Sequence, residues 1–414
     1  MVDNTGNNGS SNIGKRPLEG IRMLEYAIFH AGPGAGAIMG DLGADVIKIE
    51  SSQGDPVRIW SQVGALNFAV SSGQSIMFDI ANRNKRGISI DIKTNEGREI
   101  FHRLVKNTDV FLTNLRKSTK QKLGVDYETL SQVNPLLIHA NVSGYGPEGP
   151  FADLGAFDPM GQARSGMMFA TGTGEPTLMH FAALDQATAI AASHQILTAL
   201  LVKERWGIGQ EVHVSLYSTA MWILYANLML ASQLNIDGVL PWDRPTNSPL
   251  RNNFQCDDGG WIMGVHHPQD RYWEPLCKAT NQEALINDPR FDTEEKRTEN
   301  CPALVAIFDQ VFLTKTRNEW MQLLPTHGLM FCPVQTPSEV LQDQQALENN
   351  YIVDFDHPSH GPMKIPGYPI HFSKTPAGTK SAAPEMGQHT DEILTEAGYT
   401  MSDIEEFRKQ SVIR

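Results

Sequence analysis

The chain has 414 residues, of which 41% are hydrophobic and 20% are charged, and its formal net charge is −13. A chain of this length exceeds what one small hydrophobic core supports, so we expect one large domain and a smaller one. The acidic balance argues against nucleic acid or an anionic membrane surface as the main partner.

The first residues are polar and rich in Gly, Asn and Ser. They lack the apolar core of a signal peptide, so residues 1–16 are expected to form a disordered leader. The longest apolar stretch, residues 220–231, is shorter than the roughly 20 residues that span a bilayer, and we interpret it as a buried helix. The four cysteines lie far apart without a CxxC pair, which favours reduced cysteine, a cytoplasmic location and no metal site of the zinc-knuckle type.

Short apolar runs alternate with helical patterns over the first 145 residues. The expected strands cover residues 21–26, 45–50, 88–92, 109–114 and 136–142, and the expected helices cover residues 33–42, 95–106 and 127–133. This alternation predicts an α/β fold with a parallel sheet. Right-handed crossovers place the loops that follow the strands on one rim of such a sheet, where ligands bind.

The second half of the chain lacks this regular alternation of strands and helices. Residues 182–204 and 212–233 are strongly apolar and helical in pattern, and turns with short strands follow. The run Asp-Asp-Gly-Gly at 257–260 predicts a hairpin turn. Near the end we expect two short helices that are separated at Gly398 and Tyr399, with Ser402 as the N-cap of the second.

A glycine-rich segment, HAGPGAGAIMGDLGADVIKIE (residues 30–50), connects the first two expected strands. It is similar to a dinucleotide-binding turn, but the third glycine, Gly40, stands one place late for the G-x-G-x-x-G pattern. Close strand–helix packing is the other interpretation of these glycines. In either case the free N–H groups of a helix that begins near Pro33 favour a phosphate-bearing ligand at this rim.

Eight basic residues cluster at the strand–helix connections of the predicted sheet. They are Arg83, Lys85, Arg86, Lys93, Arg116, Lys117, Lys120 and Lys122. In an acidic protein such clustering indicates a small polyanionic ligand, because Arg and Lys form charge-assisted hydrogen bonds with phosphate. Any single one of them could instead be a solvated residue at a helix end.

Several segments occur in the order typical of one family: GIRMLEYAIFHAGPGAGAIMGDLGADVIKIE, NRNKRGISIDIK, DVFLTNLRKSTKQKLGVDYETL and GQHTDEILTEAGYTMSDI. From about residue 17 to its end, the chain resembles the class III (CaiB/BaiF-type) coenzyme A transferases. The resemblance implies a Rossmann-like large domain whose parallel sheet is built from both chain ends, a smaller α+β domain, and an interlocked dimer. The expected segments are a large CoA-binding domain (17–205), a helical linker (206–240), a small domain (240–345), and a return linker with the rest of the large domain (346–414).

The same resemblance implies the chemistry. Enzymes of this family transfer coenzyme A (CoA) between carboxylic acids through one aspartate, which matches Asp185, and they bind no permanent cofactor. A donor such as succinyl-CoA would form first an aspartyl anhydride and then an aspartyl-CoA thioester, which is nucleophilic covalent catalysis. The residues that match the family's CoA contacts are His30, Ala31, Lys93, Asn114, Arg116 and Lys122.

The acceptor acid and the partner subunit are less defined by the resemblance. The segments LTNLRKSTKQKLGVDYETL and LTKTRNEW are most similar to transferases that act on aromatic or branched acids, of the phenyllactate, 2-hydroxyisocaproate or benzylsuccinate type. An apolar pocket for such an acid would use Met167, Met168, Phe169, Trp222 and Tyr225. The partner is expected to be an identical or a homologous subunit.

Three other classes of function stay open at this stage. The first is acyl-CoA racemisation or isomerisation on the same fold, but Phe157 stands where racemases carry a proton-shuttling histidine. The second is a nicotinamide-dependent dehydrogenase, which the glycine-rich segment would permit. The third is a noncatalytic CoA-binding subunit of a heteromeric transferase.

Overall fold

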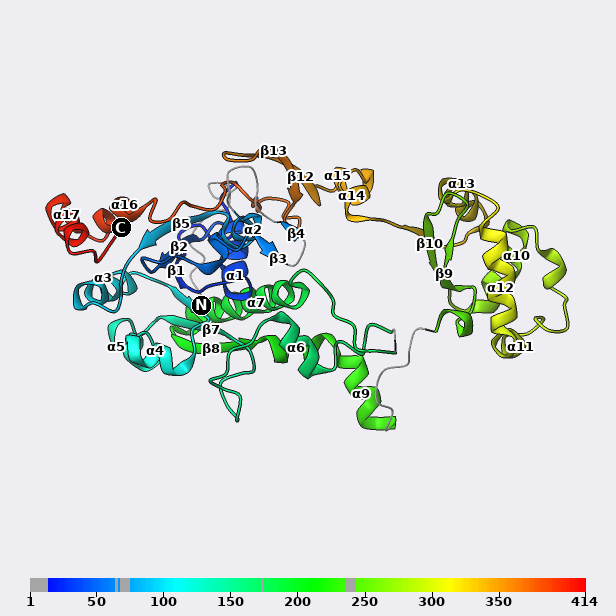
Figure 1. The fold of residues 1–414 in the computed structure, drawn as a ribbon, viewed down its shortest axis with the longest axis horizontal. Coiled ribbons are helices and arrows are strands. Elements are labelled where there is room, and N and C mark those ends of the chain that lie inside the picture. Colours follow the sequence, from blue (N-terminus) through cyan, green and yellow to red (C-terminus); the bar gives the residue numbers. More distant parts are fainter. Residues whose placement is uncertain (1–13, 64–65, 68–74, 173, 235–242) are drawn as a thin grey trace, which may run out of the picture. The chain divides into compact units, whose positions relative to one another are not determined.

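The computed structural model describes residues 14–63, 66–67, 75–172, 174–234 and 243–414 (Figure 1). Most of the expected leader therefore lies outside the described residues. Contacts divide the chain into two compact units. Unit 1 comprises Met1–Met168, Leu178–Asp237 and Asn349–Arg414, and unit 2 comprises Phe169–Thr177 and Gly238–Glu348.

Unit 1 is built on a six-stranded parallel sheet with the strand order β5-β2-β1-β6-β7-β8. Its strands are β1 (Arg22–Tyr26), β2 (Asp45–Glu50), β5 (Lys85–Ser89), β6 (Val110–Thr113), β7 (Ile138–Ser143) and β8 (Gln210–Ser215). The predicted α/β class is thus confirmed. The chain runs from β1 to β2 and β5 on one side and from β6 to β7 and β8 on the other. The order therefore reverses between β1 and β6, which is where open α/β sheets bind ligands.

Helices cover both faces of this sheet. Helices α1 (Ala31–Asp41) and α7 (Ala183–Trp206) pack together and against the strands on one face. The core of the other face is built by α3 (Asn95–Val105), α4 (Lys117–Leu123), α5 (Tyr127–Val133), α16 (Thr390–Glu396) and α17 (Met401–Lys409). Figure 1 shows α16 and α17 beside α3, so the two ends of the chain share one hydrophobic core.

The C-terminal segment does not supply a strand to the parallel sheet, which corrects the expectation of a sheet built from both chain ends. It adds one isolated antiparallel bridge, between Ile90 and Ile413. Its main contribution is the buried faces of α16 and α17, which carry Ile393, Leu394 and Ile404. The physical reason is the helical spacing of these apolar residues, which buries one face of a helix rather than alternate positions of a strand.

The largest departures from the predicted strands are at β5 and β8. The third strand covers Lys85–Ser89 instead of residues 88–92, because the Lys85 side chain is fully buried against Glu25 at 2.6 Å. In the sequence alone, a lysine gives no sign that it is paired inside the core, so Lys85 was not predicted to be part of a strand. Most of the edge strand β8 falls in residues 212–233, which were expected to be helical. The strand passes directly into helix α8 (Leu216–Ile223) through a capping box made by Ser215 and Ser218, so the sequence pattern shows no break between strand and helix.

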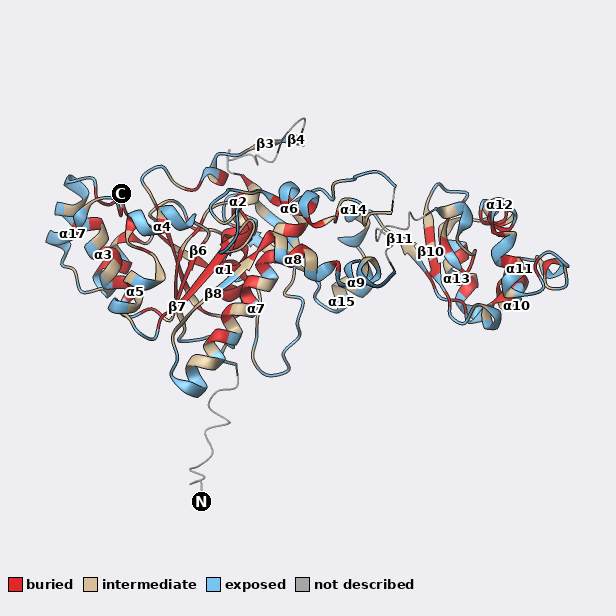
Figure 2. Cartoon of the chain, turned by 90° about the horizontal axis from the view of Figure 1, so that it is seen from below, coloured by how far each residue is buried: buried red, intermediate tan, exposed pale blue. Residues whose placement is uncertain are grey.

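The apolar stretch at 220–231 is not a buried helix. It spans α8 and α9 (Tyr225–Leu234), and α9 has no buried side chain, whereas α1 is buried throughout (Figure 2). In the described part of the chain, no helix combines the length and the apolar character that crossing a membrane requires. The second helix of the tail also begins differently, because Thr400 and not Ser402 is its N-cap and pairs with Asp403 in a capping box.

The remaining elements of unit 1 are short or peripheral. They are α2 (Ile76–Asn82), α6 (Asp158–Ser165), the β3–β4 pair (Gln62–Val63 and Leu66–Asn67) and the β12–β13 hairpin (Ile352–His357 and Gly361–Pro366).

Unit 2 has its own aromatic core between an antiparallel sheet and four helices. The sheet consists of β9 (Arg251–Gln255), β10 (Trp261–Val265) and β11 (Phe331–Val334). The helices are α10 (Gln269–Ala279), α11 (Glu294–Glu299), α12 (Cys301–Phe312) and α13 (Arg317–Leu323), and α14 (Pro337–Val340) and α15 (Gln344–Glu348) follow. The predicted hairpin turn at 257–260 joins β9 to β10 and is confirmed. All four cysteines are free.

The glycines of α1 allow close packing on both sides of the helix. A Cβ atom on Gly34 would lie 2.9 Å from the Cβ of Ala189 in α7, and one on Gly36 would lie 1.9 Å from Oε2 of Glu25 in β1. That Glu25 carboxylate is buried and pairs with both Lys48 (3.3 Å) and Lys85 (2.6 Å). Of the two interpretations of the glycine-rich segment, close strand–helix packing therefore accounts for these glycines.

Gly36→Ala is expected to destabilise unit 1 by about 3 kcal/mol or more, because the new methyl group displaces a carboxylate from a buried ion pair. Gly34→Ala should cost less, about 1–2 kcal/mol, because a shift of a few tenths of an ångström between α1 and α7 relieves its contact. Urea denaturation of the two variants measures this order. Equal stabilities of Gly36→Ala and the parent protein would contradict it.

Candidate active site

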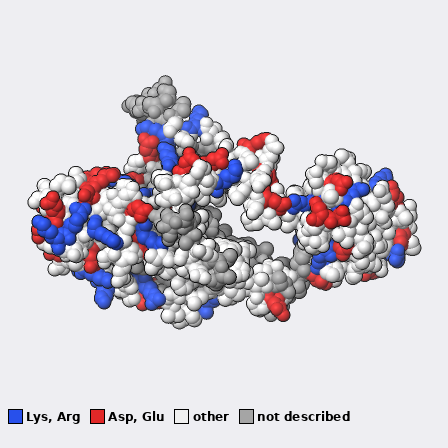
Figure 3. Space-filling model, turned by 45° about the horizontal axis from the view of Figure 1, so that its top comes forward, with Lys and Arg blue, Asp and Glu red and all other residues white. Residues whose placement is uncertain are grey.

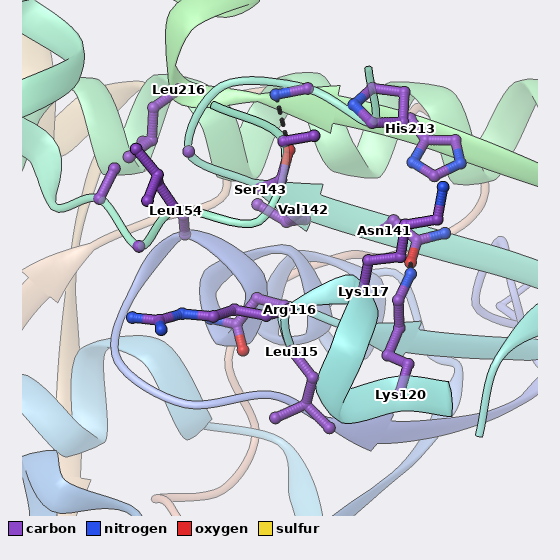
Figure 4. Close-up of a pocket in the computed structure, with 18 of the residues that line it drawn as sticks. Leu115, Arg116, Lys117, Lys120, Asn141, Val142, Ser143, Leu154, His213 and Leu216 are labelled. Atoms are coloured by element: carbon purple, nitrogen blue, oxygen red, sulfur yellow. Dashed lines mark hydrogen bonds between the residues drawn. The ribbon is translucent and has the colours of Figure 1, made fainter. Parts of the chain in front are cut away.

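A pocket of about 720 Å³ opens at the carboxyl ends of β1, β6, β7 and β8, wholly within unit 1 (Figure 4). Its position beside the switch between β1 and β6 agrees with the rim predicted from the sequence. It is lined by residues 28–31 after β1, residues 114–117 and 119–121 around the start of α4, Asp126, Glu128, residues 141–144 and 146–148 at the end of β7 and after it, residues 152, 154–157 and 160, and Asp185, Glu211, His213 and Leu216. Four of the predicted site residues are brought together here with Asp185: His30, Ala31, Asn114 and Arg116.

Asp185 lies in the first turn of α7. The two residues before α7 begins, Phe181 and Ala182, have φ angles of 62° and 55°. Ala182 is the N-cap residue and gives the helix no side-chain cap. This sharp left-handed turn aims the start of the long helix at the pocket. Because non-glycine residues rarely adopt this backbone conformation, such strain is typical of functional sites.

The pKa of Asp185 is raised to about 7, first by burial and then by the negative charge of Asp158. Position in the first turn of a helix would by itself favour the ionised carboxylate. The structure does place Asp185 there, but the N–H groups of Leu184 and Asp185 already donate to Oδ2 of Asp158, at 2.7 and 3.0 Å. The N–H groups at the helix terminus therefore hydrogen-bond to the carboxylate of Asp158 and not to that of Asp185, whose pKa stays raised.

His30 is the N-cap residue of α1 and is buried. Burial lowers its pKa, which outweighs the hydrogen bond with Gln186 and keeps the imidazole neutral at neutral pH. Its Nε2 lies 2.9 Å from Oε1 of Gln186, so Nε2 donates and Nδ1 is left as a buried acceptor without a partner in the protein. In this tautomer the unpaired nitrogen of His30 therefore offers a ligand a hydrogen-bond acceptor.

Polar side chains fix the backbone of the loop that precedes His30 by hydrogen bonds. Lys48 donates to the carbonyl oxygen of Ala27 at 2.9 Å, and Asp55 accepts from the N–H of Phe29 at 3.3 Å. Asn114 accepts from the N–H of Ile28 at 3.0 Å and donates to its carbonyl oxygen at 2.6 Å. Because both polar atoms of the Asn114 amide are used in this way, Asn114 shapes the pocket wall by fixing the backbone of the loop.

A polar cluster closes the other end of the pocket. Lys120 and Asn141 point toward each other (Figure 4), and Nδ2 of Asn141 donates to Glu211 at 3.0 Å. Burial opposes ionisation of Glu211, but its hydrogen bond with His213 and the nearby positive charges lower its pKa to about 2. Lys120 is thus engaged inside the protein, and Arg116 and Lys117 are the exposed cations among the lining residues.

The other basic residues of the predicted cluster lie elsewhere. Arg83 pairs with Asp41, Lys85 pairs with Glu25, and Arg86 pairs with Asp45, Glu392 and Glu396, so these three stabilise the fold. Lys93 and Lys122 are exposed and do not line the pocket. On the face that Figure 3 presents, Lys and Arg are interspersed with Asp and Glu. The expected convergence of eight cations is therefore wrong, because a sequence pattern does not distinguish a paired cation from an available one.

None of the five residues expected to form an apolar subsite lines this pocket. Met167 is buried, Trp222 and Tyr225 are exposed on α8 and α9, and Met168 and Phe169 lie elsewhere in the chain. The apolar lining comes instead from residues that the sequence did not single out for this purpose: Phe29, Leu154, Phe157, Met160 and Leu216. Phe29 and Phe157 meet edge to face with their ring centroids 5.1 Å apart.

One group in the described part of unit 1 has the composition of a metal site: Asp79, His357 and His360. The two imidazole rings are stacked at 4.0 Å with 9° between their planes, so their in-plane lone pairs do not converge on one ion. Nδ1 of His357 also accepts from the N–H of Ser359, which places its proton on Nε2, facing Asp79 at 3.4 Å. These three residues therefore form polar contacts that connect α2 to the β12–β13 hairpin.

Comparison with known proteins gives a consistent picture. The family model for CoA-transferase family III matches residues 18–390. The chain is 32% identical to (R)-2-hydroxy-4-methylpentanoate CoA-transferase of Clostridioides difficile, over 96% of this chain and 99% of that one. It is 31% identical to cinnamoyl-CoA:phenyllactate CoA-transferase of Clostridium sporogenes, over 96% of this chain and 97% of that one. A crystal structure of a CaiB/BaiF family protein from Brucella suis matches with a TM-score of 0.83 and 29% identity, over 92% of this chain and all of that one.

Proposed function

The chain belongs to CoA-transferase family III, and from this premise we propose that Asp185 carries CoA from a donor acyl-CoA to an acceptor carboxylic acid. The observation that carries the proposal is the position of Asp185, which lines the pocket at the carboxyl ends of the strands and whose carboxyl group has a raised pKa. Perturbed carboxylates in clefts are candidates for covalent catalysis.

The proposed reaction has two matched halves. A carboxylate oxygen of Asp185 attacks the donor thioester carbon, the C–S bond breaks, and CoA thiolate leaves an aspartyl anhydride behind. The thiolate then attacks the aspartyl carbonyl carbon, which releases the donor acid and forms an aspartyl-CoA thioester. The acceptor carboxylate reverses both steps. One activated acyl bond is exchanged for another throughout, so no ATP is consumed.

The acceptor is proposed to be a branched or aromatic 2-hydroxy acid, with succinyl-CoA as one possible donor. Two relatives support this class through their names, one for a branched hydroxy acid and one for phenyllactate. The apolar wall made by Phe29, Phe157 and Met160 offers such a side chain a surface near Asp185. Phe157 also has no proton to exchange, which disfavours racemisation at this position.

The active unit is proposed to be an interlocked dimer of identical or homologous chains. Its support is the exposed apolar surface of α8 and α9, where Trp222 is 76%, Tyr225 57% and Leu234 57% exposed. Contiguous exposed apolar surface of this kind marks protein interfaces. We propose a cytoplasmic location, where the free cysteines would stay reduced.

The test of the transferase function is an exchange assay with the purified protein. A panel of acyl-CoA donors is mixed with 2-hydroxy acids, and new acyl-CoA is detected by mass spectrometry. Transfer to a branched or aromatic acid without ATP is expected. Deuterium incorporation at C2 of an acyl-CoA without transfer would indicate an isomerase instead, and binding without either reaction would indicate a noncatalytic subunit.

Arg116→Ala is expected to raise the KM for the acyl-CoA donor about tenfold, with a smaller effect on kcat, because loss of one charge-assisted phosphate contact costs about 1.5 kcal/mol. Arg116 is an exposed cation of the pocket lining, whereas Lys106 is an exposed cation outside it, at the C-cap of α3. Steady-state kinetics of Arg116→Ala and Lys106→Ala make the comparison. Equal KM values for the two variants would remove Arg116 from the proposed site.

A further inference from the structure

The role of Asp158 goes beyond the proposed function and rests on it. We propose that Asp158 is a positioning residue that fixes the first turn of α7 and holds a second negative charge behind Asp185. Formation of either covalent intermediate on Asp185 then relieves a repulsion that exists in the free enzyme. Asp158 itself does not line the pocket, so it acts through Asp185 and not on the substrate.

The geometry of Asp158 is that of a cap supplied by another helix. Asp158 is the first residue of α6 and is only 6% exposed. Its Oδ2 accepts the N–H groups of Leu184 and Asp185, at 2.7 and 3.0 Å. These are donors that the N-cap residue Ala182 leaves without a side-chain partner. Asp158 therefore fixes the backbone of the nucleophile itself.

Gln162 fixes Asp158 in turn. This fully buried residue donates from Nε2 to Oδ1 of Asp158. The same amide donates to the carbonyl oxygen of Met179 at 2.8 Å and accepts from its N–H at 3.0 Å. Both edges of the Gln162 amide are thus assigned, and its orientation leaves Oδ1 of Asp158 as an acceptor. Three N–H donors on one buried side chain favour a carboxylate over an amide.

The charge of Asp158 matters because of where charge goes in the reaction. In the free enzyme, the carboxylates of Asp158 and Asp185 both lie at the start of α7. When Asp185 attacks the thioester, its negative charge passes to the CoA sulfur, and the resulting anhydride is neutral. When the thiolate returns, the charge leaves with the donor acid, and the aspartyl-CoA thioester is neutral too. Repulsion between Asp158 and Asp185 is therefore present in the free enzyme and absent in both covalent intermediates.

Asp158→Asn removes this charge and keeps the shape. Formation of the Asp185–CoA thioester is followed against pH by acid quenching and intact-mass measurement after mixing with donor acyl-CoA. In the parent protein the pH midpoint is expected near 7. In the variant it should fall by about 1 pH unit or more, as expected for removal of one nearby like charge. At pH 8.5 the equilibrium fraction of thioester relative to free enzyme should fall about tenfold, since the less basic carboxylate is also the poorer acceptor.

Two further variants separate charge from structure. Asp158→Glu keeps the charge but moves the acceptor, so slower capture with a midpoint still near 7 is expected. Asp403→Asn removes a carboxylate from the first turn of the distant helix α17 and should match the parent protein in both readouts. Thermal melts confirm that each variant is folded at the pH values used.

The possible outcomes are distinct. An unchanged midpoint and thioester fraction in folded Asp158→Asn overturns the inference. If that variant does not fold, Asp158→Glu decides: a midpoint near 7 supports the role of charge, and a midpoint lowered by a full unit with the charge retained overturns it. Absence of any adduct on Asp185 in the parent protein instead refutes the proposed function on which the inference rests.

Discussion

Asp185→Asn is expected to reduce CoA transfer about 10⁴-fold or more, because an amide is a poor nucleophile and cannot form an anhydride. The variant is close to isosteric, so the pocket and the affinity for acyl-CoA should be retained. Steady-state and single-turnover transfer assays measure the loss, and equilibrium binding of CoA measures the retention. A variant with a tenth or more of the parent rate would exclude Asp185 as the nucleophile.

The same substitution should make the protein more stable at alkaline pH. The folded-state pKa of Asp185 is about 7, above the value of about 4 for an unperturbed aspartate. The folded protein thus holds this proton more tightly, so the contribution of the group to stability is fully present below pH 4 and is lost as the pH rises through 7. Asparagine stays neutral, and at pH 8 a gain of about 2–4 kcal/mol is expected, shrinking toward pH 4.

Denaturation of both proteins at pH 4.5 and pH 8 tests this linkage. Asp403→Asn is the control, since Asp403 is exposed and pairs with Thr400 at a remote helix terminus. A stabilisation of Asp185→Asn that is the same at both pH values would mean that packing, rather than charge, is responsible. No stabilisation at pH 8 would show that the carboxylate is not held at a raised pKa.

Trp222→Glu is expected to convert the proposed dimer into monomers and to abolish transfer with it. Trp222 is 76% exposed in the single chain and stacks edge to face on Tyr225 at 5.5 Å. Burial of such an aromatic side chain at the centre of an interface contributes about 2–4 kcal/mol, and a buried unpaired carboxylate in its place costs more. The dissociation constant of the dimer should therefore rise at least about 1000-fold. Analytical ultracentrifugation over a range of concentrations measures it.

Met401→Glu provides the matched control, because Met401 is 55% exposed on α17 in the C-terminal segment. It should leave the sedimentation behaviour and the transfer rate unchanged. If Trp222→Glu sediments like the parent protein, the surface of α8 and α9 is not the dimer interface. If the parent protein is itself monomeric and active, the dimer proposal fails as a whole.

The sequence predicted the architecture well where local pattern and burial agree. Strand β2 and helix α5 have the predicted bounds, and the structure has a pocket at the rim that the strand–helix alternation predicted. Where a pattern admits two physical causes, the sequence left both open. The glycines of α1 serve packing against Glu25 and Ala189, although the same residues suit a phosphate loop.

Other features depend on tertiary partners that no local pattern reveals. Lys85 is a strand residue only because Glu25 neutralises it in the core. Asp158 precedes Asp185 by 27 residues, and its capping of α7 exists only because the two helices meet at the pocket. For the same reason the raised pKa of Asp185 could not be foreseen, since position near a helix terminus alone predicts the opposite direction.

Peptide mapping of the acid-quenched reaction tests the central claim most directly. The protein is mixed with a donor acyl-CoA in the absence of acceptor, quenched, treated with hydroxylamine or left untreated, and digested. The account predicts CoA attached through a thioester to the peptide that contains Asp185, and its conversion to a hydroxamate on that residue by hydroxylamine. Rapid transfer to an acceptor acid, with the Asp185 peptide unmodified at every time point, would contradict it.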